Sequence, residues 1–368
     1  MAAEPFRTPM YDFHVSLGAR MVEFAGWSMP LSYRGITEEH VHTRTACSVF
    51  DVSHMGRLRL TGKDCESLLN RICTRNLANA EIGRCYYSHI CRDDGGILDD
   101  VIVSRFETRW GIVCNASNRE KIIAWLKSHA AGLNVEVVDE TFSTAMLAIQ
   151  GPKTLDLAIT LTGLDSSKLK RYHLAEYGYL GMPIVVYRSG YTGEDGLEVV
   201  FPSGATKPLV PLLLGTPEKP HPIVKPAGLG ARDTLRIEAA MPLYGHELTE
   251  EIDSLTAGQS WCVDLNKDFI GALAMRRVKA EGLPRHLVGL ELEGRRIGRQ
   301  HQKVIAGGSE IGEVTSGTLS PTLGKSIAMA IVRSEFGKPG TALAVELSGK
   351  HVAAKVTPLP FYQRPGKR

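Results

Sequence analysis

Two adjacent carboxylates stand where the local pattern of the chain normally excludes charge. In GGILDD, residues 95–100, Asp99 and Asp100 begin a run of apolar and β-branched residues that predicts a strand. Successive strand residues point to opposite faces, so one of the two carboxylates must face inward. A carboxylate in that position needs a partner, which makes GGILDD the first candidate for chemistry.

Two more stretches break their local pattern, which is common at functional sites. GYTGEDGLE, residues 190–198, is a glycine-rich turn whose Glu198 already lies inside the next predicted strand. GLGARDTLRIE, residues 228–238, puts Arg232 at a helix start, where a cation opposes the helix dipole. Two carboxylates and an arginine suit an organic ligand with an amidine-like edge and anionic groups. Taken singly, each residue is also explained by structure alone, so the residues lead no further than an organic anion site.

Other chemistries find little support. GLGARD half-matches a dinucleotide-binding loop, but its third glycine is missing and no clear strand precedes it. His40 and His42 lie two apart in a predicted helix and point different ways, so we expect no metal site. The seven cysteines are scattered and odd in number, which predicts free thiols in a reducing compartment, and we expect a cytoplasmic protein.

The elements that must position these residues alternate between helices and short strands. Thr37 is predicted to cap a helix that begins at Glu38, and further helices are predicted at 65–77, 119–132 and 153–163. Strands are predicted at 57–62, 85–91, 99–106, 110–116 and 143–151, with a hairpin at 182–202. Residues 276–285 are predicted to be a linker, after which short strands at regular spacing predict an all-β barrel or sandwich.

The composition is that of an ordinary globular chain of two or three domains. A net charge of +3 does not demand a nucleic-acid partner. Arg295, Arg296, Arg299 and Lys303 form a local basic cluster, interpreted as a solvated loop or a contact for an acidic partner. No segment is apolar over the roughly 18 residues that a membrane helix needs.

Seven motifs, in order, resemble the aminomethyltransferase (T-protein) family of the glycine cleavage system. They are RTPMYDFHVSLGARMVEFAGWSMP, VFDVSHMG, GGILDD, GYTGEDGLE, GLGARDTLRIEAAMPLYGHEL, DFIG and VTSGTLSPTLGKSIAMA. The resemblance runs from Arg7 to Phe361. It implies transfer of the methylene of an aminomethyl group, held on the lipoyl arm of an H-protein, to tetrahydrofolate, with release of ammonia.

The resemblance also implies an α+β, multidomain fold around a central channel. Two interleaved mixed α/β lobes, residues 1–50 with 140–277 and residues 51–139, would bind folate within region 1–277. A C-terminal β-barrel would span residues 284–368, which agrees with the change of pattern near residue 280.

Carried over residue by residue, the resemblance implies a catalytic role for Asp100 beside the reacting edge of the folate, whereas Asp99 is assigned to structure. Glu198 would meet the pterin ring, with a carboxylate suited to its paired donors. Arg232 would bind the glutamate tail. Met55, Tyr87, Asn115 and Trp261 would line the folate channel, and Arg299 and Tyr362 align with further channel positions.

The chain departs from the family pattern at residues 256–259, which read TAGQ where E-A-G-L is common. Three other functions of related chains remain open at this point. A folate-dependent demethylase of a small methylated substrate would need no H-protein, and a non-catalytic folate-binding assembly factor would carry a K-G-C-Y motif that is absent here. The folate module of a sarcosine-type dehydrogenase would need a flavin domain.

Overall fold

The computed structural model describes residues 4–162, 165–166, 168–179, 181–216 and 218–365. By its internal contacts the chain divides into two compact units. Unit 1 comprises residues 1–65, 79–86 and 102–233, and unit 2 comprises residues 66–78, 87–101 and 234–368. These bounds differ from the two interleaved lobes that the resemblance implies, and those lobes stay a prediction.

Unit 1 is built on a six-stranded mixed sheet in the order β11-β12-β13-β10-β4-β14. Its strands are β11 (Leu174–Tyr179), β12 (Met182–Tyr187), β13 (Gly196–Pro202), β10 (Thr144–Gln150), β4 (Cys47–Asp51) and β14 (Val224–Pro226). β12 and β13 pair antiparallel, with Tyr187 opposite Glu198, so the hairpin predicted at 182–202 is confirmed. The apolar core of the unit lies against this sheet, around Val49, Leu147 and Phe201.

A second sheet that lies wholly in unit 1 has three strands in the order β1-β3-β2. It consists of β1 (Phe6–Arg7), β3 (Trp27–Ser32) and β2 (Arg20–Phe24). The helices of unit 1 are α1 (Tyr11–Ser16), α2 (Ile36–Thr45), α4 (Arg119–His129), α5 (Thr154–Thr162) and α6 (Thr206–Leu214).

The five-stranded sheet carries the GGILDD motif and has the order β6-β7-β8-β5-β9. Its strands are β6 (Arg84–Cys91), β7 (Ile97–Arg105), β8 (Trp110–Cys114), β5 (Gly56–Thr61) and β9 (Glu136–Asp139). The chain passes between the two units within β6 and again within β7. The five strands confirm those predicted at 57–62, 85–91, 99–106 and 110–116, and they add β9.

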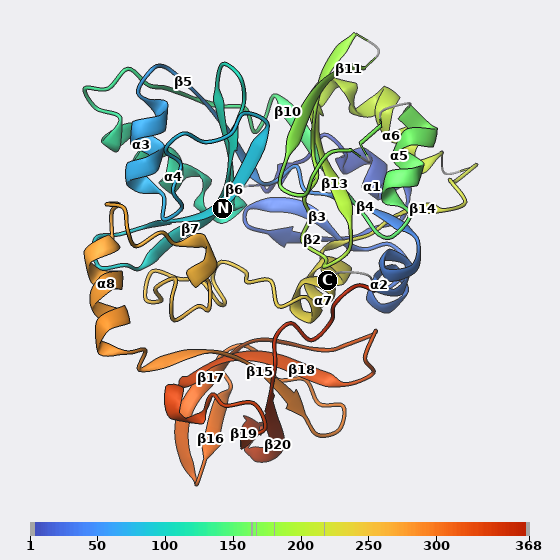
Figure 1. Ribbon diagram of the computed structural model, residues 1–368. Helices are drawn as coiled ribbons and strands as arrows, with labels where there is room; N and C mark the ends of the chain where they lie inside the picture. Colours follow the sequence, from blue (N-terminus) through green and yellow to red (C-terminus); the bar gives the residue numbers. More distant parts are fainter. Residues whose placement is uncertain (1–3, 163–164, 167, 180, 217, 366–368) are drawn as a thin grey trace. The chain divides into compact units, whose positions relative to one another are not determined.

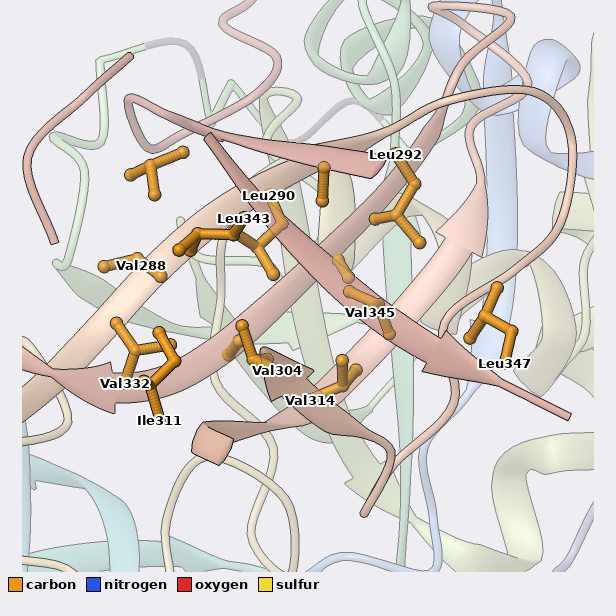
Figure 2. Close-up of a cluster of buried hydrophobic side chains, with 14 residues drawn as sticks. Val288, Leu290, Leu292, Val304, Ile311, Val314, Val332, Leu343, Val345 and Leu347 are labelled. Carbon is orange, nitrogen blue, oxygen red and sulfur yellow. The ribbon is translucent and has the colours of Figure 1, made fainter. Parts of the chain in front are cut away.

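The C-terminal strands close into a barrel in the order β15-β18-β17-β16-β19-β20 (Figure 1). They are β15 (Arg285–Leu292), β18 (Ser326–Arg333), β17 (Ser309–Leu319), β16 (Lys303–Ala306), β19 (Ala342–Leu347) and β20 (Lys350–Thr357). Alternate residues of each strand point inward, and 14 buried side chains such as Leu290, Val314 and Val345 fill the interior (Figure 2). The predicted barrel is confirmed, and it belongs to unit 2.

Two local predictions are wrong. Residues 276–285 are not a linker, because α8 (Ala272–Glu281) continues through most of them, with Met275 buried on its inner side. Thr37 does not cap α2, which already begins at Ile36. Instead the Glu39 carboxylate accepts hydrogen bonds from the N–H groups of Tyr33, Arg34 and Gly35 before the helix, so a side chain inside the helix satisfies the donors in front of it.

The remaining helices are α3 (Cys65–Ile72), which lies almost wholly in unit 2, and α7 (Leu229–Glu238), which begins in unit 1 and ends in unit 2. Short 3-10 turns cover Ala116–Asn118, Ser203–Ala205, Ser260–Cys262 and Ser334–Phe336. All seven cysteines are free and buried. Among the described residues, no helix combines the length and the apolar character required to cross a bilayer.

Candidate functional site

The two carboxylates of GGILDD take different positions on β7. The Asp99 side chain is completely buried, whereas Asp100 is half-buried and contacts the neighbouring strand. There the Tyr87 hydroxyl, on β6, donates a hydrogen bond to Asp100 Oδ2 over 3.1 Å. Because successive residues of β7 point to opposite faces, Asp99 is buried inside the fold, whereas Asp100 is the carboxylate that Tyr87 contacts.

Two stacked aromatic side chains lie next to the Asp100 carboxylate in unit 2. The Tyr87 ring stacks on the Trp261 indole, with ring centroids 5.2 Å apart and planes 17° apart. Trp261 is 53% exposed, and its Nε1–H donates to Gln259 Oε1 over 2.9 Å. The Tyr87 ring and the Gln259 hydrogen bond hold the Trp261 indole in place, and its exposed surface can stack on a flat aromatic ligand.

A buried histidine lies behind Tyr87. His89 Nε2 is 3.3 Å from the Tyr87 hydroxyl, and His89 Nδ1 is 2.7 Å from Ser254 Oγ. The ring is fully buried, and burial lowers the pKa of His89 to about 3, so the imidazole is neutral at physiological pH. Neither His89 nor Ser254 was predicted from the sequence. The signal for His89 was its spacing of two from Tyr87, which puts both on one face of β6.

In unit 1, Glu198 and Arg232 form the second group of candidates. Glu198 lies on β13, and its Oε2 accepts a hydrogen bond from the Ser189 hydroxyl. Arg232 lies in the first turn of α7, with its guanidinium carbon 4.9 Å from the centroid of the Tyr191 ring. Burial lowers the pKa of the Arg232 guanidinium, and the negative charge of Glu198 opposes this shift. The two candidates therefore interact electrostatically.

Arg232 Nη1 is buried and has no hydrogen-bond partner among the described residues. Leaving a buried charged donor unsatisfied costs on the order of 1–3 kcal/mol or more. His54, whose burial lowers its pKa to about 4, interacts electrostatically with Arg232, and its Nδ1 likewise lacks a partner within the described parts of the chain. The unsatisfied Arg232 donor fits a ligand that brings an acceptor oxygen.

The other four candidates lie on separate elements. In unit 1, Met55 occupies the turn between β4 and β5, where its carbonyl accepts a hydrogen bond from Arg57 Nη1, and Asn115 follows β8. In unit 2, Arg299 is exposed in the loop between β15 and β16, and the Tyr362 N–H donates to the Glu238 carbonyl over 2.8 Å. Contacts bring Asp100, Tyr87 and Trp261 together, and charge couples Glu198 with Arg232, while the roles of these four stay predictions.

The residues thus supply three capabilities: an aromatic surface, an ordered carboxylate, and a buried cation with a free donor. In unit 2 the aromatic surface suits a flat heteroaromatic ring, and in unit 1 the buried cation suits an acceptor oxygen. Within the described residues, no cluster of three or more His, Cys, Asp or Glu side chains has a geometry that could hold a metal ion.

Comparison with known families covers almost the whole chain. Residues 10–267 match the family described as GCVT N-terminal domain, and residues 285–363 match the family described as glycine cleavage T-protein C-terminal barrel domain. The second match coincides with the closed barrel of unit 2, strands β15 to β20.

Individual relatives match at full length. An aminomethyltransferase of Moorella thermoacetica is 43% identical over 363 residues, which cover 98% of this chain and 99% of the relative. An aminomethyltransferase of Rubrobacter xylanophilus is 45% identical and covers 97% and 94% of the two chains. The crystal structure of glycine cleavage system aminomethyltransferase T from Bartonella henselae superposes with a TM-score of 0.90 at 34% identity, over 97% of this chain and 98% of that one.

Proposed function

The chain belongs to the glycine cleavage T-protein family, and from this premise we propose that it is an aminomethyltransferase that uses tetrahydrofolate. It would accept the methylene of the aminomethyl group on the lipoyl arm of an H-protein, release ammonia, and leave the arm as a dithiol. Both family domains and relatives matched from end to end support this activity. The demethylase and assembly-factor alternatives find no comparable support.

The observation that carries a catalytic proposal is the Asp100 carboxylate, held by Tyr87 beside the Trp261 face. We assign to Asp100 the task of orienting the pterin and stabilising the positive charge that develops as N5 accepts the one-carbon unit. Its second task is to help move the proton released there. Positioned acid–base groups of this kind typically contribute about 10²–10⁴-fold to the rate.

Glu198 and Arg232 are proposed to bind the folate. The carboxylate of Glu198 suits the 2-amino and N3–H donors of the pterin edge. The resemblance implies that Arg232 binds the glutamate tail, which is the opposite end of the ligand. The electrostatic coupling of Arg232 with Glu198 instead favours an oxygen at the pterin end, so we propose Arg232 as a donor to that end. Met55, Asn115, Arg299 and Tyr362 are proposed to line the folate channel.

The H-protein is the proposed macromolecular partner. Arg295, Arg296 and Arg299 are exposed in one barrel loop, where a cationic surface can attract an acidic protein. A cytosolic location is proposed with it, because all seven thiols are free.

Ammonia release from aminomethyl-loaded H-protein, measured with and without tetrahydrofolate, tests the function. We expect release that depends on both substrates, with methylenetetrahydrofolate formed in equal amount. The control replaces loaded H-protein by small methylated amines. If these are consumed and the loaded H-protein is not, the chain is a demethylase and the proposal is wrong.

A further inference from the structure

One face of β6 carries three side chains, and the first of them contacts Asp100. Tyr87, His89 and Cys91 are spaced by two and therefore share a face of the strand. His89 and Cys91 are fully buried, and Tyr87 reaches Asp100 on the adjacent strand β7. Ser254, also fully buried, contacts both the His89 ring and the Cys91 thiol. All of these residues belong to unit 2.

The directions of the hydrogen bonds follow from the available protons. An ionised Asp100 can only accept, so the one hydroxyl proton of Tyr87 points to Asp100 Oδ2. The Tyr87 oxygen then accepts from His89, which requires the proton on Nε2. A neutral imidazole carries one proton, so Nδ1 is the acceptor and the Ser254 hydroxyl must donate to it.

The chemistry of the buried end agrees with this direction. Burial raises the pKa of the Cys91 thiol, which therefore keeps its proton and can donate it to the Ser254 oxygen. The depressed pKa of His89 keeps the ring neutral, as the chain of donors requires. Every donor in the series thus points toward the carboxylate of Asp100.

We propose that His89 and Ser254 are positioning residues that fix the Tyr87 hydroxyl as a donor to Asp100. Without the Nε2–H, the Tyr87 oxygen loses the hydrogen bond that directs its own proton to Asp100, and the bond from Tyr87 to Asp100 Oδ2 weakens. Ser254 acts one step earlier, because its donation selects the tautomer of His89. This inference rests on the proposed function in one respect, namely that Asp100 is the reacting carboxylate.

The first test reads the tautomer directly and needs no activity. In protein labelled with ¹⁵N-histidine, long-range proton–nitrogen correlations distinguish Nε2–H from Nδ1–H rings, and His89→Gln identifies the resonance. We expect a neutral His89 with its proton on Nε2 between pH 6 and pH 8, and a change of tautomer or partial exchange in Ser254→Ala. A proton on Nδ1 in the unaltered chain overturns the proposal.

The second test separates positioning from folding through matched variants. His89→Leu removes the donor, whereas His89→Gln keeps an N–H near the Nε2 position. With loaded H-protein and tetrahydrofolate, we expect His89→Leu to lower kcat about five- to tenfold with KM for folate nearly unchanged, the size of one neutral hydrogen bond. His89→Gln should recover activity to within about twofold. Equal losses in both variants, or a change in KM alone, overturn the proposal.

His286→Leu provides the control, because His286 Nδ1 also lies 3.0 Å from a serine hydroxyl, that of Ser334, but in the barrel. It should change thermal stability without changing kcat. If His89→Leu does not fold, Ser254→Ala removes only one oxygen atom and is expected to lower kcat about two- to fivefold. Unchanged kcat in a folded Ser254→Ala chain argues against the role of Ser254.

A double-mutant cycle with Tyr87→Phe shows whether His89 acts through Tyr87. Once the hydroxyl is gone, His89→Leu should cost nothing further, whereas independent contributions would multiply. Multiplied losses overturn the proposal. If the unaltered chain releases no ammonia, the proposed function fails, while the tautomer still decides whether the chain of donors exists.

Discussion

Asp100 in unit 2 receives a hydrogen bond from a tyrosine that is itself supported by His89 and Ser254. Arg232 in unit 1 is held differently. Its guanidinium lies against the Tyr191 ring, and its Nη1 is buried without a partner in the described part of the chain. A buried, neutral histidine lies near each group: both ring nitrogens of His89 are bonded, whereas Nδ1 of His54 has no partner within the described residues.

This difference separates two tasks. A carboxylate whose orientation is set by the protein is ready before a ligand arrives, so its contribution belongs in the rate of the chemical step. A buried cation with an unsatisfied donor, such as Arg232, is stabilised most when a ligand supplies the missing acceptor. Its contribution should therefore appear in the Kd for the ligand. Substitutions in the two regions should therefore change different kinetic constants.

The largest expected effect is that of Asp100→Asn. Because the carboxylate acts chiefly in the transition state, we expect kcat to fall by about 10²–10⁴-fold while the Kd for folate stays within a few-fold. Stopped assays of ammonia and titration of folate fluorescence measure the two quantities. Asp94→Asn, at an exposed carboxylate before the same turn, serves as the control. Equal losses of binding and rate would mean that Asp100 only binds the folate. Asp100 and Arg232 would then not differ in the kinetic constant that they control.

Arg232→Ala should act on binding. Loss of a charged hydrogen bond of about 1.5–3 kcal/mol predicts a Kd for folate weakened roughly ten- to hundredfold, with kcat little changed at saturation. Pteroate, which lacks the glutamate, locates the contact. Equal weakening for folate and pteroate places Arg232 at the pterin end, whereas a loss confined to folate places it at the glutamate tail.

The buried histidines predict acid sensitivity. The pKa of His54 is lowered to about 4, below the value of about 6.5 in an unfolded chain, so the unfolded state binds more protons between these values. Stability is therefore fully present above pH 6.5 and decreases as the pH falls toward 4, by up to about 1.4 kcal/mol per pH unit for each such histidine. Urea unfolding at pH 7 and pH 5 measures this slope.

His54→Leu should flatten that slope at little cost at pH 7, since it removes an unsatisfied nitrogen. His89→Leu should also flatten the slope, but it should lower stability at pH 7, because the Ser254 hydroxyl loses its acceptor. The exposed His351 is the control, and His351→Gln should leave the slope intact. Equal costs for the two leucine variants at pH 7 would contradict the contrast between bonded and unbonded rings.

The smallest effect is expected for the exposed cations of the barrel loop. If Arg295, Arg296 and Arg299 attract an acidic H-protein, the apparent KM for that protein should rise a few-fold between 50 and 300 mM salt, because exposed charges are screened. Replacing the three by glutamine should abolish the dependence. A KM independent of salt in the unaltered chain would show that the loop is only a solvated loop and does not attract the H-protein.

Regular patterns made much of the fold predictable. The hairpin at 182–202 and the barrel strands follow from alternating residues and glycine turns, and the buried strand around GGILDD follows from its β-branched run. The 276–285 segment was misjudged because its charges suggest a linker, whereas one buried face is enough to hold α8. Glu39 replaced Thr37 as the cap because a long carboxylate reaches back over several N–H groups.

The site was predictable only in part. Asp100, Glu198 and Arg232 break their local patterns, so single stretches reveal them. His89 sits in an ordinary strand pattern, and its partner Ser254 is 165 positions away, so only the fold brings them together. Gln259, which orients the Trp261 indole, was noted as a departure from the family pattern, but its contact could not be inferred from the sequence.

The seven buried thiols have a consequence for redox chemistry. Exchange between thiols and disulfides proceeds through the thiolate, which burial suppresses. The pKa values of Cys47 and Cys73 are raised to about 11, so roughly one molecule in 10⁴ carries a thiolate at neutral pH at either position. If the partner is the proposed H-protein, its lipoyl arm would be left as a dithiol, and exchange of that arm with these buried thiols would be slow, so the two electrons of the arm would stay on it.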